Sequence, residues 1–191
     1  MNEELFYNDV EKALEVLHNG GIILYPTDTI WGIGCDATNA LAVEKIIELK
    51  NRPVQKSFVV LVADEKDILQ YTASPDLAVF DYLETLTKPA TVIYQHALGL
   101  AENILAADGS VAIRICKDEF CKHLIKRFRK PIVSTSANTS GNISPANFSQ
   151  IEERIKESVD YIVQYRQDEL TASIPSSIIK WERGKAVLIR E

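Results

Sequence analysis

Short apolar runs alternate with amphipathic segments along most of the chain. The runs at 22–25, 58–62 and 90–94 are apolar on successive residues, which is typical of strands buried on both faces of a sheet. The segments 39–50 and 118–128 place apolar residues three and four positions apart, which predicts helices. This alternation of strands and helices predicts an α/β protein.

The remaining pattern completes the expected element order. A first helix is expected at 10–17, capped by Asn8 and ended by Gly20-Gly21. We read 96–109 as irregular, with a lid as one interpretation. Further helices are expected at 64–69, from Ser74-Pro75 to 86 and at 151–156, and further strands at 110–115, 132–133, 161–163, 176–180 and 186–190. The last two strands are expected to form a hairpin.

Composition indicates an ordinary globular protein. The chain has 191 residues, of which 46% are hydrophobic and 25% charged, and we expect one domain over 1–191. The net charge of −6 argues against a broad basic surface for nucleic acid. A local basic cavity remains compatible with this total, because the field in a cleft follows the nearby charges.

The sequence shows no pattern typical of a targeting segment or of a metal site. The start of the chain lacks the pattern of a signal peptide, and no apolar run approaches the ~18 residues of a membrane span. The three cysteines form no CxxC pair, which predicts reduced thiols and a cytoplasmic protein away from membranes. The three histidines have no zinc-type spacing, so the sequence identifies no metal ligands.

The expected strand at 110–115 carries a cation on an otherwise small face. One face holds three branched apolar residues, whereas the other holds Ser110, Ala112 and Arg114. A buried arginine needs an anionic partner or ligand, because an unpaired buried charge is costly. The alternative is an edge strand with Arg114 in solvent.

The segment 131–145 changes from an apolar strand into a run of hydroxyl and amide side chains around Gly141. Ser134 and Ser136 share the parity of Ile132 and can face one side. Backbone N–H groups in such a turn form an anion-binding concavity, and ligands of open α/β sheets bind beyond strand ends. A plain surface linker has the same composition, and the residues alone leave both interpretations open.

Two further groups suit anions. Thr27 and Thr29 follow the expected strand at 22–25, and Lys50 and Arg52 end the helix at 39–50. Terminal cations also complement a helix dipole, which is the simpler interpretation. The chain shows no Ser–His–acid set and no dense carboxylate pair. Phosphoryl or nucleotidyl transfer needs mainly positioning and charge neutralisation, which these cations and hydroxyls can supply.

Five motifs in order carry a resemblance to a known family. The stretches are YPTDTIWGIGCD, KNRP followed by Lys56, SVAIR, STSANTSG with a following Ser-Pro, and SSII. Together they resemble the YrdC-type threonylcarbamoyl-AMP synthases across nearly the whole chain. The resemblance implies a single α/β domain with a twisted mixed β-sheet and flanking helices around a positively charged cavity. It also implies a nucleotidyltransferase that forms threonylcarbamoyl-AMP and pyrophosphate from L-threonine, bicarbonate or CO2, and ATP.

The resemblance also implies roles for individual residues. The threonine site would comprise Thr29, Arg114, Ser134 and Ser176. The catalytic residues that hold the nucleotide phosphates would be Lys50, Arg52, Ser136 and Asn138. Further ATP contacts would come from Lys56, Ser110, Ser144 and Arg190, beside Arg52 and Ser136. Mg²⁺ would accompany ATP, and the product would pass to a tRNA threonylcarbamoyltransferase complex, with at most weak direct tRNA binding.

Some positions depart from the family pattern. Leu61 stands where some relatives have a histidine, and Lys180 stands where many have an aspartate. Two alternatives to the synthase remain at this point. One is a non-catalytic paralogue of the same fold that binds nucleotide or RNA. The other is a carbamoyl-transfer relative that acts on a different acceptor amine.

Overall fold

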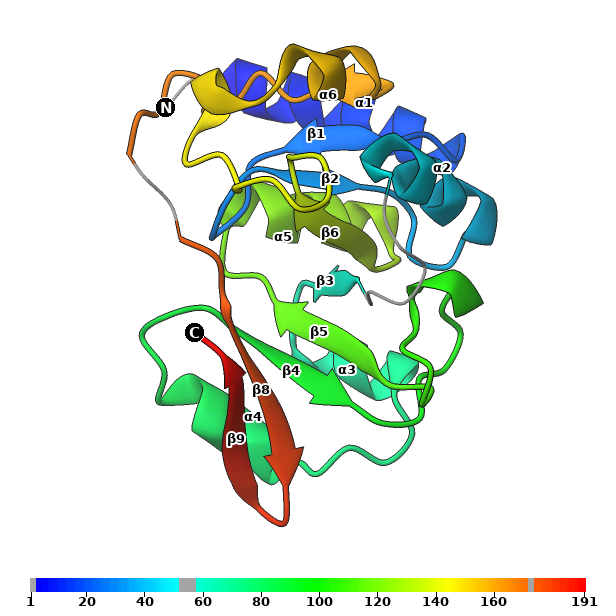
Figure 1. Ribbon diagram of the computed structural model, residues 1–191, viewed down its shortest axis with the longest axis vertical. Coiled ribbons are helices and arrows are strands. Elements are labelled where there is room, and N and C mark those ends of the chain that lie inside the picture. The colour runs from blue at the N-terminus through cyan, green and yellow to red at the C-terminus, as the bar shows by residue number, and fades with distance from the viewer. Residues whose placement is uncertain (1–2, 52–57, 172–173) are drawn as a thin grey trace.

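One twisted sheet runs through the molecule from top to bottom (Figure 1). The computed structural model describes residues 3–51, 58–171 and 174–191. Within these ranges the nine strands lie in the order β7-β1-β2-β6-β3-β5-β4-β8-β9. The strands are β1 (Ile23–Tyr25), β2 (Gly32–Gly34), β3 (Val59–Val62), β4 (Ala90–Tyr94), β5 (Val111–Ile115), β6 (Ile132–Ser136), β7 (Tyr161–Ile162), β8 (Ser177–Glu182) and β9 (Lys185–Arg190).

The sheet is mixed, and β6 joins its two parts. Strand β6 pairs antiparallel with β2 on one side and with β3 on the other. Parallel pairs are β1 with β7, β3 with β5, and β4 with β8, whereas β8 and β9 form an antiparallel hairpin. The predicted mixed α/β fold is therefore confirmed.

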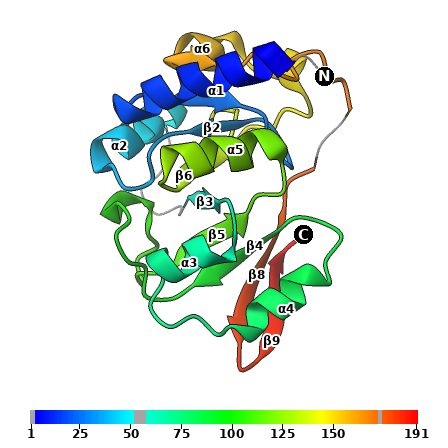
Figure 2. The ribbon, with the colours of Figure 1, turned by 180° about the vertical axis from the view of Figure 1, so that it is seen from behind.

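Two hydrophobic clusters cover the sheet. Helices α1 (Glu3–His18) and α5 (Glu119–Phe128) lie together on one side (Figure 2) and share a cluster with Tyr25, Leu61 and Ile132. Helix α2 (Ala40–Lys50) and the 3-10 helix η1 (Glu102–Ile104) belong to the other cluster. The remaining helices are α3 (Glu65–Tyr71), α4 (Ala78–Glu84), α6 (Glu153–Glu157) and the 3-10 helix η2 (Phe148–Gln150). Within the described part of the chain, no helix combines the length and the apolar character that a membrane span requires.

Local sequence accounts for several helix boundaries. Asn39 caps α2 as predicted, because its side-chain oxygen accepts from the backbone N–H groups of Leu41 and Ala42. Asp64 caps α3 through a capping box with Asp67. Side-chain oxygens that satisfy the first free N–H groups therefore set the starts of these helices.

Three sequence predictions are wrong in detail. Helix α1 begins at Glu3 rather than after Asn8, because Phe6 extends its buried face. Helix α4 begins at Ala78, and Ser74 has a left-handed backbone with φ of 49° that cannot serve as an extended cap. The expected loop after β1 contains β2. The segment 96–109 is irregular as predicted, apart from η1, and its Ile104 is buried in the core.

Candidate functional site

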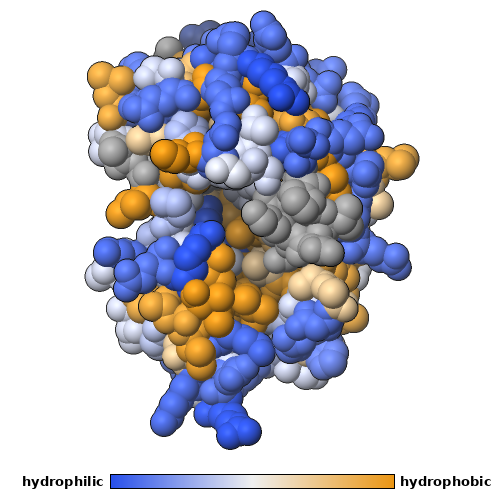
Figure 3. All heavy atoms as spheres, in the orientation of Figure 1, coloured by the Kyte–Doolittle hydropathy of each residue, from blue (hydrophilic) through white to orange (hydrophobic). Residues whose placement is uncertain are grey.

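A cavity of about 190 Å³ lies among strands β2, β3, β5, β6, β8 and β9. Figure 3 shows a hollow on the left side of this face, between the part of the molecule that holds β1 and β2 and the part that holds β4, β8 and β9. Seven of the residues predicted from sequence line the cavity: Thr29, Arg114, Ser134, Ser136, Ser144, Ser176 and Arg190. The structure thus brings together residues from the first and last parts of the chain.

Strand register places the cavity side chains on one face of the sheet. Ser134 lies opposite Val59, and Val59 lies opposite Ala112, two residues before Arg114. Directly opposed residues of neighbouring strands share a face, so the predicted common orientation of Ser134 and Ser136 is confirmed. The cavity is a continuation of the sheet face that α1 and α5 cover farther along.

Gly32 keeps space open between β2 and β6. It lies opposite Ser136, and a Cβ atom added to it would stand 3.0 Å from the Ser134 hydroxyl oxygen. Its neighbour in β1, Tyr25, lies beneath this strand and donates its hydroxyl to the Val133 carbonyl at 3.1 Å. Burial raises the pKa of Tyr25, so it remains a neutral donor there.

Arg114 is a buried cation at the cavity wall. Strand β5 lies between β3 and β4, and Arg114 is only 4% exposed, so the edge-strand alternative is wrong. Its Nη1 donates to the Ser176 hydroxyl at 3.2 Å, and its Nη2 lies 3.1 Å from a carboxylate oxygen of Asp28. Its Nε and Nη2 have no hydrogen-bond partner of good geometry among the described residues. The guanidinium therefore retains donors that the protein itself does not satisfy.

Asp28 is a site residue that sequence reasoning missed. Its side chain is 7% exposed and also accepts from the backbone N–H of Lys117 at 3.2 Å and from the Cys116 thiol at 3.3 Å. A signal was present in the sequence. A buried Arg114 requires an anion, and Asp28 is the acidic residue in the PTDT loop that follows β1.

The PTDT loop is held in place by its own hydroxyl groups. Thr27 donates its hydroxyl to the Ile30 carbonyl at 2.8 Å and accepts from the Thr29 backbone N–H at 3.1 Å. Arg166 adds an ion pair with Asp118 at 2.6 Å and reaches the Thr27 carbonyl. These contacts fix Thr29 at the cavity.

Lys50 is buried against the loop that follows β6. It is 1% exposed, and its ammonium donates to the backbone carbonyls of Ser136 and Asn138. Neither Lys50 nor Asn138 lines the cavity. The Asn138 amide nitrogen donates to the carbonyls of Thr139 and Asn142. In this structure both residues shape the loop after β6, and their contact with phosphates stays a prediction.

The remaining predicted ATP residues divide into three groups. Arg190 lines the cavity and donates to the Ser176 carbonyl at 3.3 Å. Ser110 lies outside the cavity lining and donates its hydroxyl to Asp108 at 2.6 Å. Arg52 and Lys56 lie outside the described residues.

The described lining of the cavity carries two guanidinium groups, from Arg114 and Arg190, and no carboxylate. Such a lining can bind an anion through charge and hydroxyl donors. No group of three or more His, Cys, Asp or Glu side chains among the described residues is arranged to hold a metal ion.

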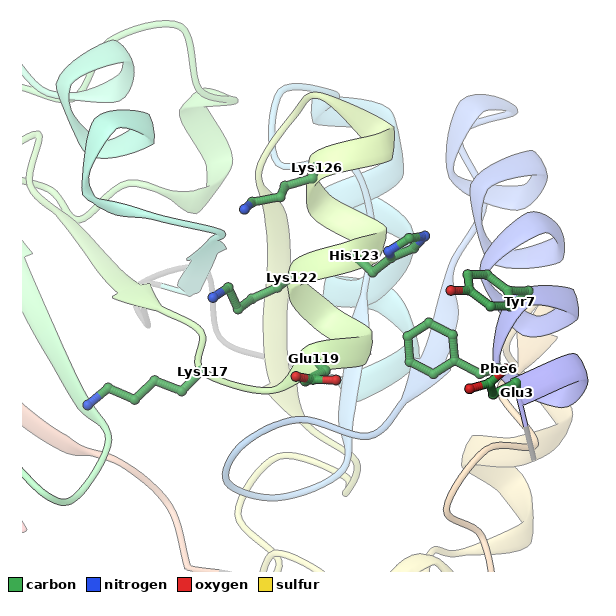
Figure 4. Close-up of a pocket in the computed structure, with 8 residues that line it drawn as sticks. All are labelled: Glu3, Phe6, Tyr7, Lys117, Glu119, Lys122, His123 and Lys126. Carbon is green, nitrogen blue, oxygen red and sulfur yellow. The ribbon is translucent and has the colours of Figure 1, made fainter. Parts of the chain in front are cut away.

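A larger hollow of about 380 Å³ lies along α1 and α5 (Figure 4). Its lysines, Lys117, Lys122 and Lys126, extend away from the aromatic side chains of Phe6 and Tyr7. None of the predicted site residues lines it. Because it lacks convergent polar groups, this hollow is a weaker candidate than the smaller cavity.

Comparison with solved structures supports the fold. The structure of P. abyssi Sua5 complexed with L-threonine matches with a TM-score of 0.83 and 22% sequence identity over 95% of this chain. This chain spans only 53% of that Sua5 chain. At this level of identity the likeness establishes a shared fold.

Comparison with sequences identifies the family. A protein of Idiomarina loihiensis named threonylcarbamoyl-AMP synthase is 32% identical over 176 residues, which covers 90% of this chain and 92% of that protein. A putative threonylcarbamoyl-AMP synthase of Methanocaldococcus jannaschii is 33% identical and covers 98% of this chain and 89% of that protein. Residues 15–191 match the Sua5/YciO/YrdC family, which is described as "Telomere recombination". The chain therefore belongs to the Sua5/YciO/YrdC family.

Proposed function

We propose that this protein is a threonylcarbamoyl-AMP synthase, a nucleotidyltransferase that uses L-threonine, bicarbonate or CO2, and ATP. The observation that carries this proposal is the cavity in which Arg114 and Arg190 meet four serine hydroxyls and Thr29. Relatives covering nearly the whole chain bear the name of this enzyme.

Arg114 and Ser176 form the binding site for the threonine carboxylate in this proposal. Guanidinium and carboxylate match in shape and charge, and Arg114 has donors left over after its contacts with Ser176 and Asp28. The cavity volume of about 190 Å³ suits an amino acid. Sites for larger ligands usually enclose about 300–1,000 Å³, so the nucleotide extends beyond it across the loop after β6.

The reaction needs positioning and charge neutralisation rather than a covalent enzyme intermediate. The threonine amine combines with bicarbonate, with loss of water, to give a carbamate. A carbamate oxygen then attacks the α-phosphorus of ATP, the bond from that phosphorus to the bridging oxygen breaks, and pyrophosphate leaves. Ser136, Ser144 and Arg190 hold phosphate oxygens, while Lys50 and Asn138 keep the loop after β6 in shape.

Mg²⁺ would offset negative charge on the phosphates when it accompanies ATP. The product is a mixed anhydride that is destined for transfer to an amine, and we place this protein before a tRNA threonylcarbamoyltransferase complex. The net charge of −6 agrees with a small-molecule enzyme that binds tRNA weakly at most.

The test is incubation of the purified protein with ATP, bicarbonate and L-threonine, followed by mass analysis of the adenylate and assay of pyrophosphate. We expect both products together, and neither when threonine or bicarbonate is omitted. L-serine and other amines in place of threonine test the alternative acceptor. Tight tRNA binding without any adenylate would contradict the proposal and favour a binding paralogue.

A matched pair of serine variants tests the cavity itself. Ser136→Ala removes a hydroxyl from the lining, and Ser149→Ala removes an exposed hydroxyl that contacts Asn147. A hydrogen bond to a charged group contributes about 1.5–3 kcal/mol, so we expect kcat/KM for ATP to fall at least about tenfold in Ser136→Ala. Ser149→Ala should match the wild type.

A further inference from the structure

We propose that Asp28 is a positioning residue that orients the Arg114 guanidinium toward the carboxylate of the amino-acid substrate. The inference rests on the proposed function, because it assigns that carboxylate to Arg114. It concerns a residue that does not line the cavity and acts through another residue.

Two side chains contact the guanidinium of Arg114 and limit its rotation. Asp28 lies 3.1 Å from Nη2, and Ser176 accepts from Nη1 at 3.2 Å. Ser176 is in turn fixed by the Thr91 hydroxyl at 2.8 Å. A planar group held at two nitrogens cannot rotate freely about its own axis. The contacts therefore determine which edge of the guanidinium a ligand meets.

Asp28 itself has a fixed orientation, because each of its two carboxylate oxygens has a partner in the protein. One accepts from the Lys117 backbone N–H at 3.2 Å, and the other accepts from the Cys116 thiol and faces Arg114. Each of these neighbours is a donor. An asparagine at this position would direct its NH2 group at one of them, so an amide of the same shape cannot satisfy both sides.

The charge of Asp28 has a second consequence. A desolvated guanidinium without a counter-ion is costly, and Asp28 offsets its charge while the cavity is empty. The substrate carboxylate then meets a cation that is already ordered, so little rotamer entropy is lost on binding. Asp28 orients Arg114 without touching the substrate. Its replacement should therefore change the affinity for threonine rather than the rate of the chemical step.

The experiment compares Asp28→Asn with Asp36→Asn. Asp36 is a matched control, because it is also buried, pairs with Lys130 at 2.6 Å and accepts from the Thr38 backbone and hydroxyl. It lies outside the cavity lining. We measure KM and kcat for threonine, KM for ATP, and the Kd values of L-threonine and L-threoninamide by calorimetry.

For Asp28→Asn we expect a rise of about tenfold in KM for threonine, with kcat and KM for ATP within about threefold of wild type. The preference for threonine over threoninamide should fall by a similar factor, since the amide lacks the carboxylate. Asp36→Asn should lose thermal stability without either change. Unchanged or tighter threonine binding in Asp28→Asn, or an equal effect in Asp36→Asn, would overturn the inference.

Asp28→Glu is the second variant, for the case in which Asp28→Asn does not fold. It keeps the charge but moves the carboxylate by one methylene, so the guanidinium is displaced and KM for threonine should again rise. A folded Asp28→Glu protein with the wild-type KM and the wild-type preference would contradict the inference. A wild-type protein without threonine-dependent turnover would instead contradict the proposed function, and the two failures are therefore distinguishable.

Discussion

The two sides of the cavity each depend on a buried cation, and the two cations are used differently. On the side of β6, Lys50 donates to the carbonyls of Ser136 and Asn138 and does not reach the cavity. On the side of β5, Arg114 lines the cavity and keeps donors without hydrogen-bond partners among the described residues. Burial of a charge alone therefore does not identify a ligand site.

The difference lies in what satisfies each cation. Backbone carbonyls of one loop accept from Lys50, so its charge stabilises the conformation of that loop. Arg114 has an ion pair and one hydroxyl contact, which leave part of its hydrogen-bonding capacity for a ligand. We infer that contacts within the protein fix the conformation of the β6 side of the cavity. On the β5 side, bound substrate supplies the hydrogen-bond partners that Arg114 still lacks.

The largest expected effect comes from removal of Arg114. Arg114→Ala deletes the group that we propose binds the threonine carboxylate, and it leaves Asp28 buried without its cation. The value of kcat/KM for threonine should therefore fall at least about a hundredfold. Stability should fall by about 3–5 kcal/mol because one partner of a buried pair is lost. Steady-state kinetics and urea denaturation measure the two effects.

A double variant separates these two effects. Asp28→Ala with Arg114→Ala removes both charges, so part of the stability should return while threonine binding stays lost. Arg154→Ala, at an exposed position on α6, is the control and should behave as wild type. Normal threonine turnover in the double variant would show that the carboxylate binds elsewhere.

The next effect concerns Lys50 and should be mainly structural. Lys50→Met keeps the bulk of the side chain but withdraws the donor from two carbonyls, which should lower stability by about 3 kcal/mol. For a chain of this length that corresponds to a fall in Tm of about 6–12 °C, measured by calorimetry without ligands. Lys45→Met is the control, because Lys45 also donates to a carbonyl, that of Gly20, but at the surface. A wild-type Tm with lost ATP turnover would mean that Lys50 acts on phosphate instead.

The smallest effects come from two glycines of β2. In Gly34→Ala the added Cβ would lie 2.6 Å from the Val133 carbonyl oxygen, and such overpacking should cost about 1–3 kcal/mol of stability. In Gly32→Ala the nearest atom is the Ser134 hydroxyl oxygen at 3.0 Å, and a hydroxyl can rotate away. We expect Gly32→Ala to weaken threonine binding about threefold at nearly wild-type stability. Thermal denaturation and calorimetry test the pair, and equal Tm losses would refute the distinction.

Much of the fold could be predicted because local signals agreed with tertiary packing. The apolar run of β1, the cap at Asn39 and the alternation in β5 each indicated one element. Strand β2 was missed because it has three residues, two of them glycines, which have low strand propensity. The start of α1 was missed because a cap signal at Asn8 competed with the buried Phe6.

The site was predictable where a motif supplied a hydroxyl or guanidinium that faces the cavity. Ser134, Ser136 and Arg114 are such residues. Sequence could not show that the Lys50 ammonium meets carbonyls of a loop more than eighty residues later, nor that Asp28 meets Arg114. Both contacts depend on how distant strands pack, and periodicity carries no information on that.

The separation in sequence between segments that meet in the sheet and at the cavity has a consequence for folding. Strand β1 pairs with β7, since Ile23 is opposite Tyr161, and the cavity needs both Thr29 and Arg190. Pairings between such distant segments form slowly, because long stretches of chain must be ordered first. The cavity is therefore complete only after the β8–β9 hairpin has paired with β4, and a ligand that binds there can stabilise the fold only from that point on.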